Sequence, residues 1–492
     1  MATQPLHNPV VLGRAQAFLL NVSRGARYGR RQGHGLHDRV APPPLDVLLA
    51  TRVLLLRHGL STYNVQGRIQ GRDDDSTLAA AGETMARRTG EALAGVRLDA
   101  VLSSPLRRAV HTAALVCSAR TGVTPAVAYD DDLLEVELEP WSGKSHQQVI
   151  DGWPREERTW REHPEQLTLQ RADGSSYRPI YELHLQARRF WRRLCQRHQG
   201  KTVLVVAHNA ILRCVVLAAL GLGPERFARL RMNNCALSVL NVQDGGDDTA
   251  ATVQVESLNS TVHLDPVAPG PRRGGRILLL RHGETDWNRQ SRFQGQIDVP
   301  LNATGRQQAQ QAAAFLRHSP VKRAYTSPMA RPRETAELVL AHHAGVPLVT
   351  CEGLLEIGHG LWEGKLEQDI QAQWPQLLAT WKTAPHQVVM PGPGGETIQQ
   401  VSQRAVAAME RIAQELEDGE TALVVAHDAV NKAVLCHLLG LSPAHIWCVK
   451  QGNGGVSVID YPEGGAGPAI VHSLNLTGHL GGVLDETAAG AL

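Results

Sequence analysis

One stretch of the sequence occurs twice, and this duplication limits what the chain can fold into. RHGLSTYNVQGRIQG, beginning at Arg57, aligns without a gap on RHGETDWNRQSRFQG, beginning at Arg281. Both stretches directly follow short apolar runs, residues 53–56 and 277–280. A repeat of this kind indicates two domains of common ancestry rather than a single core.

The similarity extends over both halves of the chain. Further blocks recur in the same order with small shifts in spacing: Ser-Pro-x-x-Arg at 104–108 and 327–331, Leu-Glu at 134–135 and 355–356, Val-Val-Ala-His at 205–208 and 424–427, and Ser-Leu-Asn at 257–259 and 473–475. A chain of 492 residues exceeds one ordinary core and suits two domains of roughly 200 residues. We predict a first domain over residues 51–265 and a second over residues 276–482.

The remaining segments differ from the domains in composition. Residues 266–275 are rich in Pro, Gly and Arg without apolar periodicity, which indicates a linker. Residues 483–492 are expected to form a tail. In residues 1–50, six arginines face two aspartates, as in some transit peptides. Because this segment has a single serine and no signal-peptide pattern, we predict a disordered extension instead.

Within each copy, short apolar runs alternate with longer helical patterns. This alternation is typical of α/β proteins, and we predict two tandem α/β/α sandwich domains, each with a mostly parallel central sheet. In such sheets ligands bind at the carboxyl ends of the strands. His58 follows the first apolar run and His208 follows the run 202–207, so we expect both imidazoles at one sheet edge. Residues 145–164 and 391–395 are expected to cap this edge in their respective domains.

The residues at this edge match the needs of phosphoryl transfer. The reaction requires a nucleophile aimed at phosphorus, positive charge for the non-bridging oxygens and an acid for the departing alkoxide. We expect the nucleophile, the charges and hydrogen-bond donors, and the acid to come in the first copy from His58, Arg57, Arg108, His208 and Glu135. The second copy supplies His282, Arg281, Arg331, His427 and Glu356. Glu137 and Glu139 are alternatives for the acid of the first copy.

The second arginine of each copy follows a helix-start pattern. Ser104 and Ser327 are good N-cap residues, and the prolines after them suit the first helical position. Arg108 and Arg331 would then lie in the first turn, where backbone N–H groups and the helix dipole favour an anion.

Taken together, these blocks resemble the histidine phosphatase superfamily, in the branch of the phosphoglycerate-mutase-like phosphatases. The resemblance covers nearly everything outside the tails. It implies a two-step hydrolysis in which the first histidine is phosphorylated, while the glutamate protonates the leaving oxygen and then helps water attack the phosphohistidine. It implies no metal and no cofactor. It also places Asn64, Asn288 and the backbone at Gly71 and Gly295 beside the substrate phosphate.

Parts of the sequence narrow the resemblance further. The runs AHNAILRCVV from Ala207, AHDAVNKAVL from Ala426 and QGNGGVSVIDY from Gln451 are similar to the 2-carboxy-D-arabinitol-1-phosphatase type of this family. This similarity implies a small phosphorylated metabolite, either a sugar phosphate or a phosphorylated sugar acid, as the partner.

Departures from the family pattern lie mainly in the first copy. It has Leu60 where the second has Glu284, an extra residue in the acidic run 73–75, and an altered run 139–143 after its acid. Both copies replace the usual glycine after the second histidine, with Asn209 and Asp428. A carboxylate at position 428 would either favour a protonated His427 or alter the reach of the substrate.

Overall charge and cysteine content bound the partners and the compartment. The net charge of +2 is too small for general attraction to nucleic acid or to a membrane surface. Seven cysteines without a Cys-x-x-Cys pair do not indicate a disulfide framework, so a reducing cytoplasm is the simple expectation. A homodimer stays open at this point.

Two other functions are compatible with the same residues. A cofactor-dependent phosphoglycerate mutase shares the histidine set, although the second acid block, beginning at Glu356, is more similar to the phosphatase form. In the other alternative, one domain has lost turnover and serves as a phosphate-binding or dimerisation module for its neighbour.

Overall fold

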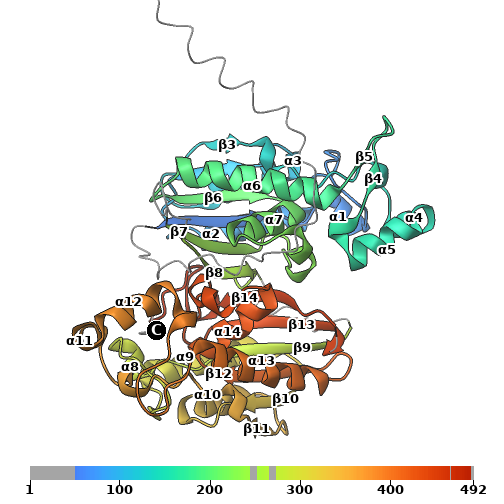
Figure 1. The fold of residues 1–492 in the computed structure, drawn as a ribbon. Coiled ribbons are helices and arrows are strands. Elements are labelled where there is room, and N and C mark those ends of the chain that lie inside the picture. Colours follow the sequence, from blue (N-terminus) through green and yellow to red (C-terminus); the bar gives the residue numbers. More distant parts are fainter. Residues whose placement is uncertain (1–49, 244–251, 265–272, 466, 489–492) are drawn as a thin grey trace, which may run out of the picture. The chain divides into compact units, whose positions relative to one another are not determined.

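The computed structural model describes residues 50–243, 252–264, 273–465 and 467–488, which belong to one compact unit. The predicted N-terminal extension, apart from its last residue, lies outside the described residues, as does most of the predicted linker. Each copy is an α/β/α sandwich built on a mostly parallel sheet, as the sequence predicted (Figure 1).

The sheet of the first copy has the order β3-β2-β6-β1-β7-β8. Its first four strands are parallel and the last two antiparallel; their bounds are β1 Thr51–Arg57, β2 Ala100–Ser103, β3 Val127–Tyr129, β6 Thr202–Ala207, β7 Leu237–Gln243 and β8 Thr252–Ser260. Strands covered on both faces read as continuous apolar runs, which is why β1 and β6 show no polar alternation.

Helices cover both faces of this sheet. Leu54 and Leu56 of β1 pack toward α2 and α3, whereas Val53 and Leu55 pack toward α6 and α7. This alternation follows from the two-residue period of a strand. The helices of this copy span α1 Thr62–Gln66, α2 Ala80–Ala92, α3 Arg107–Ala119, α4 His146–Gly152, α5 Pro154–Glu162, α6 Pro179–Arg197 and α7 Asn209–Ala219.

The second copy repeats the arrangement with the strand order β11-β10-β12-β9-β13-β14. Its strands span β9 Gly275–Arg281, β10 Val321–Thr326, β11 Leu348–Thr350, β12 Thr421–Ala426, β13 Val456–Gly465 and β14 Ile470–Leu476. Its helices span α8 Asp286–Arg289, α9 Ala303–Leu316, α10 Ala330–Leu340, α11 Glu367–Gln373, α12 Pro375–Thr383, α13 Ile398–Gln414 and α14 Asp428–Leu439.

The two sheets join through their last strands, which no sequence pattern had indicated. Strands β8 and β14 pair antiparallel with Leu258 opposite Leu474, so that twelve strands form one sheet (Figure 1). An unpaired edge strand exposes backbone N–H and C=O groups, and this pairing covers one edge of each copy.

The predicted caps differ between the copies. In the first, α4 and α5 are followed by a small hairpin, β4 (Leu169–Gln170) with β5 (Ser176–Tyr177). In the second, α11 and α12 are followed by the loop of residues 391–395, which has no regular secondary structure. Among the described residues, no helix is long and apolar enough to cross a membrane.

Candidate active sites

Strand register brings the two histidines of each copy together. Strands β1 and β6 are parallel neighbours with Arg57 opposite Ala207, so His58 and His208 leave the sheet side by side. Their ring centroids are 5.1 Å apart, and both side chains are buried. The corresponding distance between His282 and His427 is 5.2 Å. The expected meeting at one sheet edge is present in both copies.

The first histidine of each pair is held as a neutral tautomer with one unprotonated ring nitrogen. Nδ1 of His58 lies 2.7 Å from the carbonyl oxygen of Gly59, and Nδ1 of His282 lies at the same distance from that of Gly283. Because a carbonyl only accepts, Nδ1 carries the proton and Nε2 keeps its lone pair. Burial, followed by the nearby Arg57 and Arg108, lowers the pKa of His58 well below its ordinary value. A neutral imidazole with an exposed lone pair is a competent nucleophile.

The second histidines bind the serines of the Ser-Pro blocks. Nε2 of His208 lies 2.8 Å from Oγ of Ser104, and Nε2 of His427 lies 2.8 Å from Oγ of Ser327. Their Nδ1 atoms are buried and have no hydrogen-bond partner among the described residues. Burial lowers the pKa of both imidazoles. A phosphate oxygen would satisfy these orphaned nitrogens.

The serines correct one prediction. They are not N-caps, because α3 begins at Arg107 after Leu106, and α10 begins at Ala330 after Met329. The Ser-Pro pair extends the chain past the strand end before the helix starts, which leaves each hydroxyl beside a histidine. Arg108 and Arg331 still lie in the first helical turn, as predicted.

Both site arginines of the first copy have a buried nitrogen without a partner among the described residues. Arg108 donates through Nη1 and Nη2 to the carbonyls of Asp73 and Gly71, at 2.7 and 2.8 Å, whereas its Nε has no partner. Arg57 donates through Nη1 to the carbonyl of Met232 at 2.7 Å, and its Nε is likewise orphaned. Such buried donors beside a nucleophile favour an anion between them.

The second copy repeats this arrangement with one additional bond. Arg331 donates through Nη2 to the carbonyl of Gly295 at 2.9 Å, and its Nε donates to Nε2 of His282 at 3.2 Å. Arg281 donates through Nη1 to the carbonyl of Gln451, and its Nε has no partner. The bond to His282 confirms that this ring nitrogen carries a lone pair.

The glutamates rest on the N-termini of the helices that follow the second histidines. Glu135 accepts from the backbone of Ala210 and Ile211 at the start of α7, each at 3.1 Å. Glu356 accepts from the backbone of Asp428 and Ala429 at the start of α14, at 3.1 and 3.4 Å. Helix N-termini stabilise negative charge. Each carboxyl group is therefore fixed next to a histidine pair.

Neither alternative acid has such a position. Glu137 is partly exposed and lies 3.7 Å from both Arg72 and Arg171. Glu139 lines a separate surface cavity beside Lys144 and Trp153. Of these three candidates, Glu135 is the one whose carboxyl group is bound at the N-terminus of α7 beside the histidines.

Asn64 and Asn288 cap short helices through their Oδ1 atoms. Asn64 forms a reciprocal cap with Ser61 at the start of α1, and Asn288 does so with Thr285 at the start of α8. Their Oδ1 atoms also accept from Asn234 and Asn453, at 3.2 and 3.3 Å. We had not singled out these last two asparagines from the sequence. Their alignment between the copies, in RMNNCALSVL and KQGNGGVSVI, is the signal that would have found them.

Asp428 is buried between two cations. Its Oδ1 lies 3.4 Å from Nη1 of Arg281, and its Oδ2 lies 2.7 Å from Nζ of Lys432. Burial and then the charge of Asp428 raise the pKa of Glu356. The pKa of His427 is lowered, so the carboxylate does not produce a protonated histidine. In the first copy the corresponding residues are Asn209 and Arg213, and Arg213 turns away to the carbonyl of Phe227.

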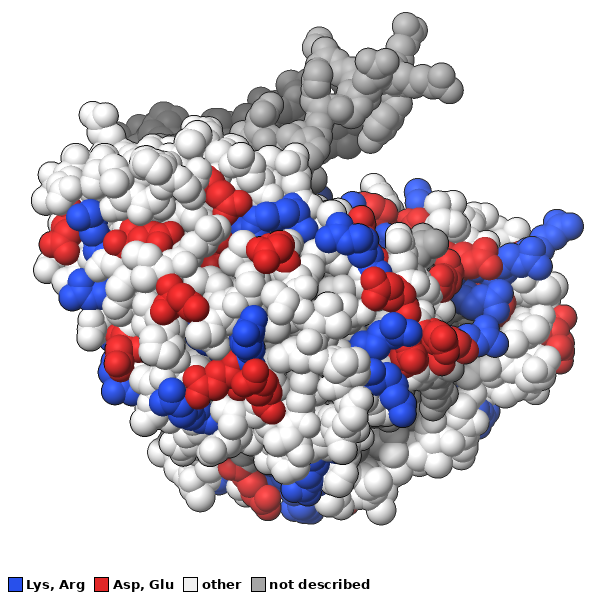
Figure 2. Space-filling model, turned by 90° about the horizontal axis from the view of Figure 1, so that it is seen from below, with Lys and Arg blue, Asp and Glu red and all other residues white. Residues whose placement is uncertain are grey.

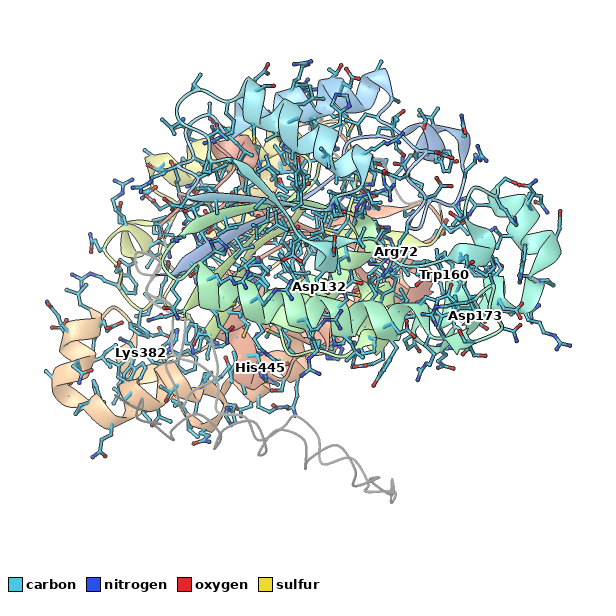
Figure 3. The ribbon with its side chains drawn as sticks, turned by 90° about the horizontal axis from the view of Figure 1, so that it is seen from above. Arg72, Asp132, Trp160, Asp173, Lys382 and His445 are labelled. Atoms are coloured by element: carbon cyan, nitrogen blue, oxygen red, sulfur yellow. The ribbon has the colours of Figure 1, made fainter. Side chains whose placement is uncertain are left out.

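In each copy, two side chains from different segments hold the glutamate loop, which we define as residues 134–135 and 355–356. In the first copy, Arg72 (labelled in Figure 3) donates through Nε to the carbonyl of Glu135 at 3.0 Å. Gln186 of α6 donates to the carbonyl of Leu134 at 2.8 Å. In the second copy, Arg404 of α13 donates to the carbonyl of Glu356 at 3.0 Å and to that of Leu355.

Gln296 of the second copy occupies the position of Arg72 and also donates to Glu356, at 3.0 Å. The arginine and the glutamine that hold the glutamate loop have therefore exchanged positions between the two copies.

On the face drawn in Figure 2, the surface does not add an extended charged patch to the charged side chains of the two sites. Acidic and basic side chains of the described residues are interspersed there, without an extended patch of one sign.

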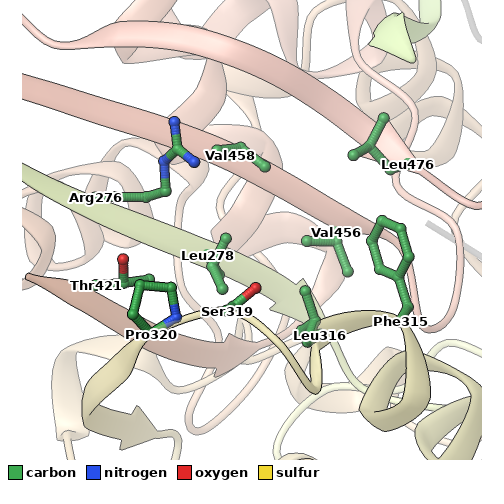
Figure 4. Close-up of a pocket in the computed structure, with 10 residues that line it drawn as sticks. All are labelled: Arg276, Leu278, Phe315, Leu316, Ser319, Pro320, Thr421, Val456, Val458 and Leu476. Atoms are coloured by element: carbon green, nitrogen blue, oxygen red, sulfur yellow. The ribbon is translucent and has the colours of Figure 1, made fainter. Parts of the chain in front are cut away.

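A small cavity of about 20 Å³ lies elsewhere in the second copy, between β9 and the end of α9 (Figure 4). Its lining includes Arg276 at the start of β9, at the strand end opposite to His282, so it is not part of the active site. Among the described residues, no three His, Cys, Asp or Glu side chains are grouped closely enough to hold a metal ion.

Known proteins share much of this sequence. The model of the histidine phosphatase superfamily (branch 1) matches residues 53–254 and residues 277–473. A protein of Triticum aestivum named 2-carboxy-D-arabinitol-1-phosphatase is 31% identical over 463 residues, which is 89% of this chain and 88% of that protein. One of Arabidopsis thaliana named probable 2-carboxy-D-arabinitol-1-phosphatase is 28% identical over 98% of both chains.

A solved structure resembles a single copy. Bacillus stearothermophilus YhfR is 34% identical, and the match covers 39% of this chain and 93% of that one with a TM-score of 0.37.

Proposed function

Because this chain belongs to branch 1 of the histidine phosphatase superfamily, we propose that it hydrolyses phosphate monoesters of small metabolites through a phosphohistidine. One observation carries the proposal: in both copies a neutral histidine with an unprotonated Nε2 lies beside buried arginine nitrogens and a buried second histidine. This is the set that phosphoryl transfer needs.

In the first step, Nε2 of His58 or His282 attacks the phosphorus atom. The N–P bond forms while the P–O ester bond breaks, and its electron pair stays on the leaving oxygen. Glu135 or Glu356 donates its proton to that oxygen, which releases an alcohol. The arginines and the second histidine stabilise the charge on the non-bridging oxygens.

In the second step, water attacks the phosphohistidine. The carboxylate formed in the first step accepts a proton from the water, the N–P bond breaks, and inorganic phosphate leaves with the imidazole restored. Every atom that changes bonding belongs to the substrate, to water or to these side chains. The proposed reaction is therefore balanced without a metal ion or cofactor.

For the substrate, we propose a sugar phosphate or a phosphorylated sugar acid, with 2-carboxy-D-arabinitol 1-phosphate as the first compound to test. The support is the pair of relatives named for this activity, each of which matches both copies. A protein named 2,3-bisphosphoglycerate-dependent phosphoglycerate mutase also matches, over 38% of this chain. A mutase would return the phosphoryl group to a second hydroxyl group instead of water.

The test replaces each nucleophile. Phosphate release from p-nitrophenyl phosphate and from a panel of sugar and sugar-acid phosphates is measured for His58→Ala, His282→Ala and the double variant. We expect each single variant to keep the activity of one copy and the double variant to be inactive. His342→Ala, which changes an exposed histidine, is the matched control. Full activity in the double variant would sink the proposal, and transfer to a hydroxyl without phosphate release would favour the mutase.

A further inference from the structure

Each catalytic histidine is held from behind by a short loop of its own copy. We define these asparagine loops as residues 233–235 and 452–454. Nδ2 of Asn234 donates to the carbonyl of His58 at 3.1 Å, and Nδ2 of Asn453 donates to that of His282 at 3.1 Å. The loop backbones add bonds to the preceding carbonyl, that of Arg57 or Arg281, each at 3.1 Å. The position of each nucleophile therefore depends on its asparagine loop.

Each asparagine loop is in turn bound by an asparagine of the joining strands. Oδ1 of Asn259 accepts from the backbone of Asn233 at 2.6 Å, and Oδ1 of Asn475 accepts from that of Gly452 at 2.8 Å. Both asparagines are buried, and both have a left-handed backbone, with φ of 52° and 50°. Such a conformation is costly for most residues other than glycine and is best tolerated by asparagine and aspartate.

The other end of each side chain reaches the opposite copy. Nδ2 of Asn259 donates to the carbonyl of His472 in β14 at 2.8 Å. Nδ2 of Asn475 donates to the carbonyl of Glu256 in β8, also at 2.8 Å. The two bonds are reciprocal, because residues 256 and 472 align with each other in the repeat. A few hydrogen bonds thus lead from each nucleophile to the backbone of the neighbouring copy.

We propose that Asn259 and Asn475 are positioning residues that brace each catalytic histidine against the opposite copy, so that each site depends on its neighbour for turnover. The inference rests on the proposed function. In-line attack tolerates little error in the position of the nucleophile, and a displacement of about 1 Å can reduce the rate about 100-fold. This brace explains why joining the two copies in one chain serves catalysis, even where they act on different substrates.

One contact across the same boundary, made by Gln254, is separate from this chain of bonds. Nε2 of Gln254 donates to the carbonyl of Trp447 at 3.4 Å, but Gln254 touches neither asparagine loop. This residue therefore provides a matched control. It separates the stability of the joined sheet from the positioning of the histidines.

The test uses the full chain with one site at a time. In the His282→Ala background only the first site turns over, and in the His58→Ala background only the second. Asn259→Asp keeps the acceptor for Asn233 and tolerates the backbone conformation, but removes the donor to His472. We expect kcat of the first site to fall about tenfold, because the histidine would move by less than the displacement that costs about 100-fold. The kcat of the second site should stay within twofold of its parent. Asn475→Gly, which avoids placing a carboxylate against Asp485, should show the mirror-image result.

Amide hydrogen exchange supplies an independent measurement. Asn259→Asp should speed exchange in residues 233–235 and leave residues 452–454 unchanged. If the aspartate variant does not fold, Asn259→Gly replaces it, since glycine adopts the same backbone without either side-chain bond. Gln254→Ala should change neither kcat nor exchange in the loops.

Two results would overturn the brace: unchanged kcat at both sites in the asparagine variants, or an equal loss at both sites such as general loosening would produce. If the parent chains release no phosphate at all, the proposed function fails, while faster exchange confined to the predicted loop would still support the brace.

Discussion

The two copies hold the same reacting groups with different surroundings. Around the glutamate loop, Arg72 and Gln186 of the first copy correspond to Gln296 and Arg404 of the second. Next to the second histidine, Asp428 is paired with Arg281 and Lys432, whereas the first copy has an asparagine in its place. The difference teaches that both copies keep the same histidines, arginines and glutamate, while the arginine that supports the glutamate loop comes from a different segment in each copy.

The segments that follow the cap helices also differ between the two copies. In the second copy, the loop 391–395 lies against the segment that follows the glutamate loop, and a Cβ on Gly358 would lie 2.0 Å from the carbonyl oxygen of Gly394. The first copy has Glu137 at that position. Its hairpin borders a cavity of about 690 Å³ instead, lined in part by Lys144 and Arg171.

The largest effect should come from removing the acids. Glu135→Gln in the His282→Ala background and Glu356→Gln in the His58→Ala background should each lower kcat about 100- to 1,000-fold, because an amide cannot protonate the leaving oxygen. Initial rates of phosphate release measure the loss. Glu137→Gln is the control and should cost less than about tenfold. A larger loss at Glu137 than at Glu135 would show that the acid has been misassigned.

The exchange of arginine and glutamine can be reversed within one copy. Arg72→Gln in the His282→Ala background should lower kcat about tenfold, in line with a small displacement of the glutamate loop. Adding Gln186→Arg should restore most of the activity, because it rebuilds the arrangement of the second copy. Steady-state kinetics of both single variants and the double variant give the coupling. Additive losses without any rescue would refute the exchange.

A smaller effect concerns pH. Asp428 raises the pKa of Glu356, so the acid stays protonated to higher pH. Asp428→Asn in the His58→Ala background should lower that pKa and move the alkaline limb of kcat/KM toward lower pH. The exposed Glu337→Gln is the control. A limb that stays in place, or moves to higher pH, would contradict the coupling between these carboxyl groups.

The smallest change should affect stability alone. His359 is buried against Phe293 and Trp381, and burial lowers its pKa to about 3. Below pH 6.5, His359 is protonated in the unfolded chain but stays neutral in the folded chain. The free energy of unfolding therefore decreases as the pH is lowered, down to about pH 3. His359→Leu, which introduces the residue of the first copy, should remove this loss of about 1.4 kcal/mol per pH unit.

Urea unfolding of the His359→Leu variant and the parent chain at pH 7 and pH 5.5 measures this effect. An equal fall in both proteins would rule out His359 as its source.

Much of the site could be predicted because the repeat marks it. His58 and His282 stand next to buried strands, and parallel pairing brings a second histidine to the same edge wherever such strands are neighbours. The N-cap prediction for Ser104 and Ser327 was wrong because capping patterns describe local preference, and here each hydroxyl binds a histidine distant in sequence. The supporting contacts of Arg72 and Gln186 connect distant segments, and no spacing rule encodes them.

The sequence alone determined the duplication, the α/β class and the set of groups able to handle phosphate, since these follow from residue type and from the order of strands and helices. Only the tertiary structure decided which glutamate lies beside the histidines and which segment supplies the arginine that supports it. It also decided that β8 and β14 join the two sheets. The physical reason is that these features are contacts between segments far apart in the chain, and their energies depend on distance and burial instead of neighbouring letters.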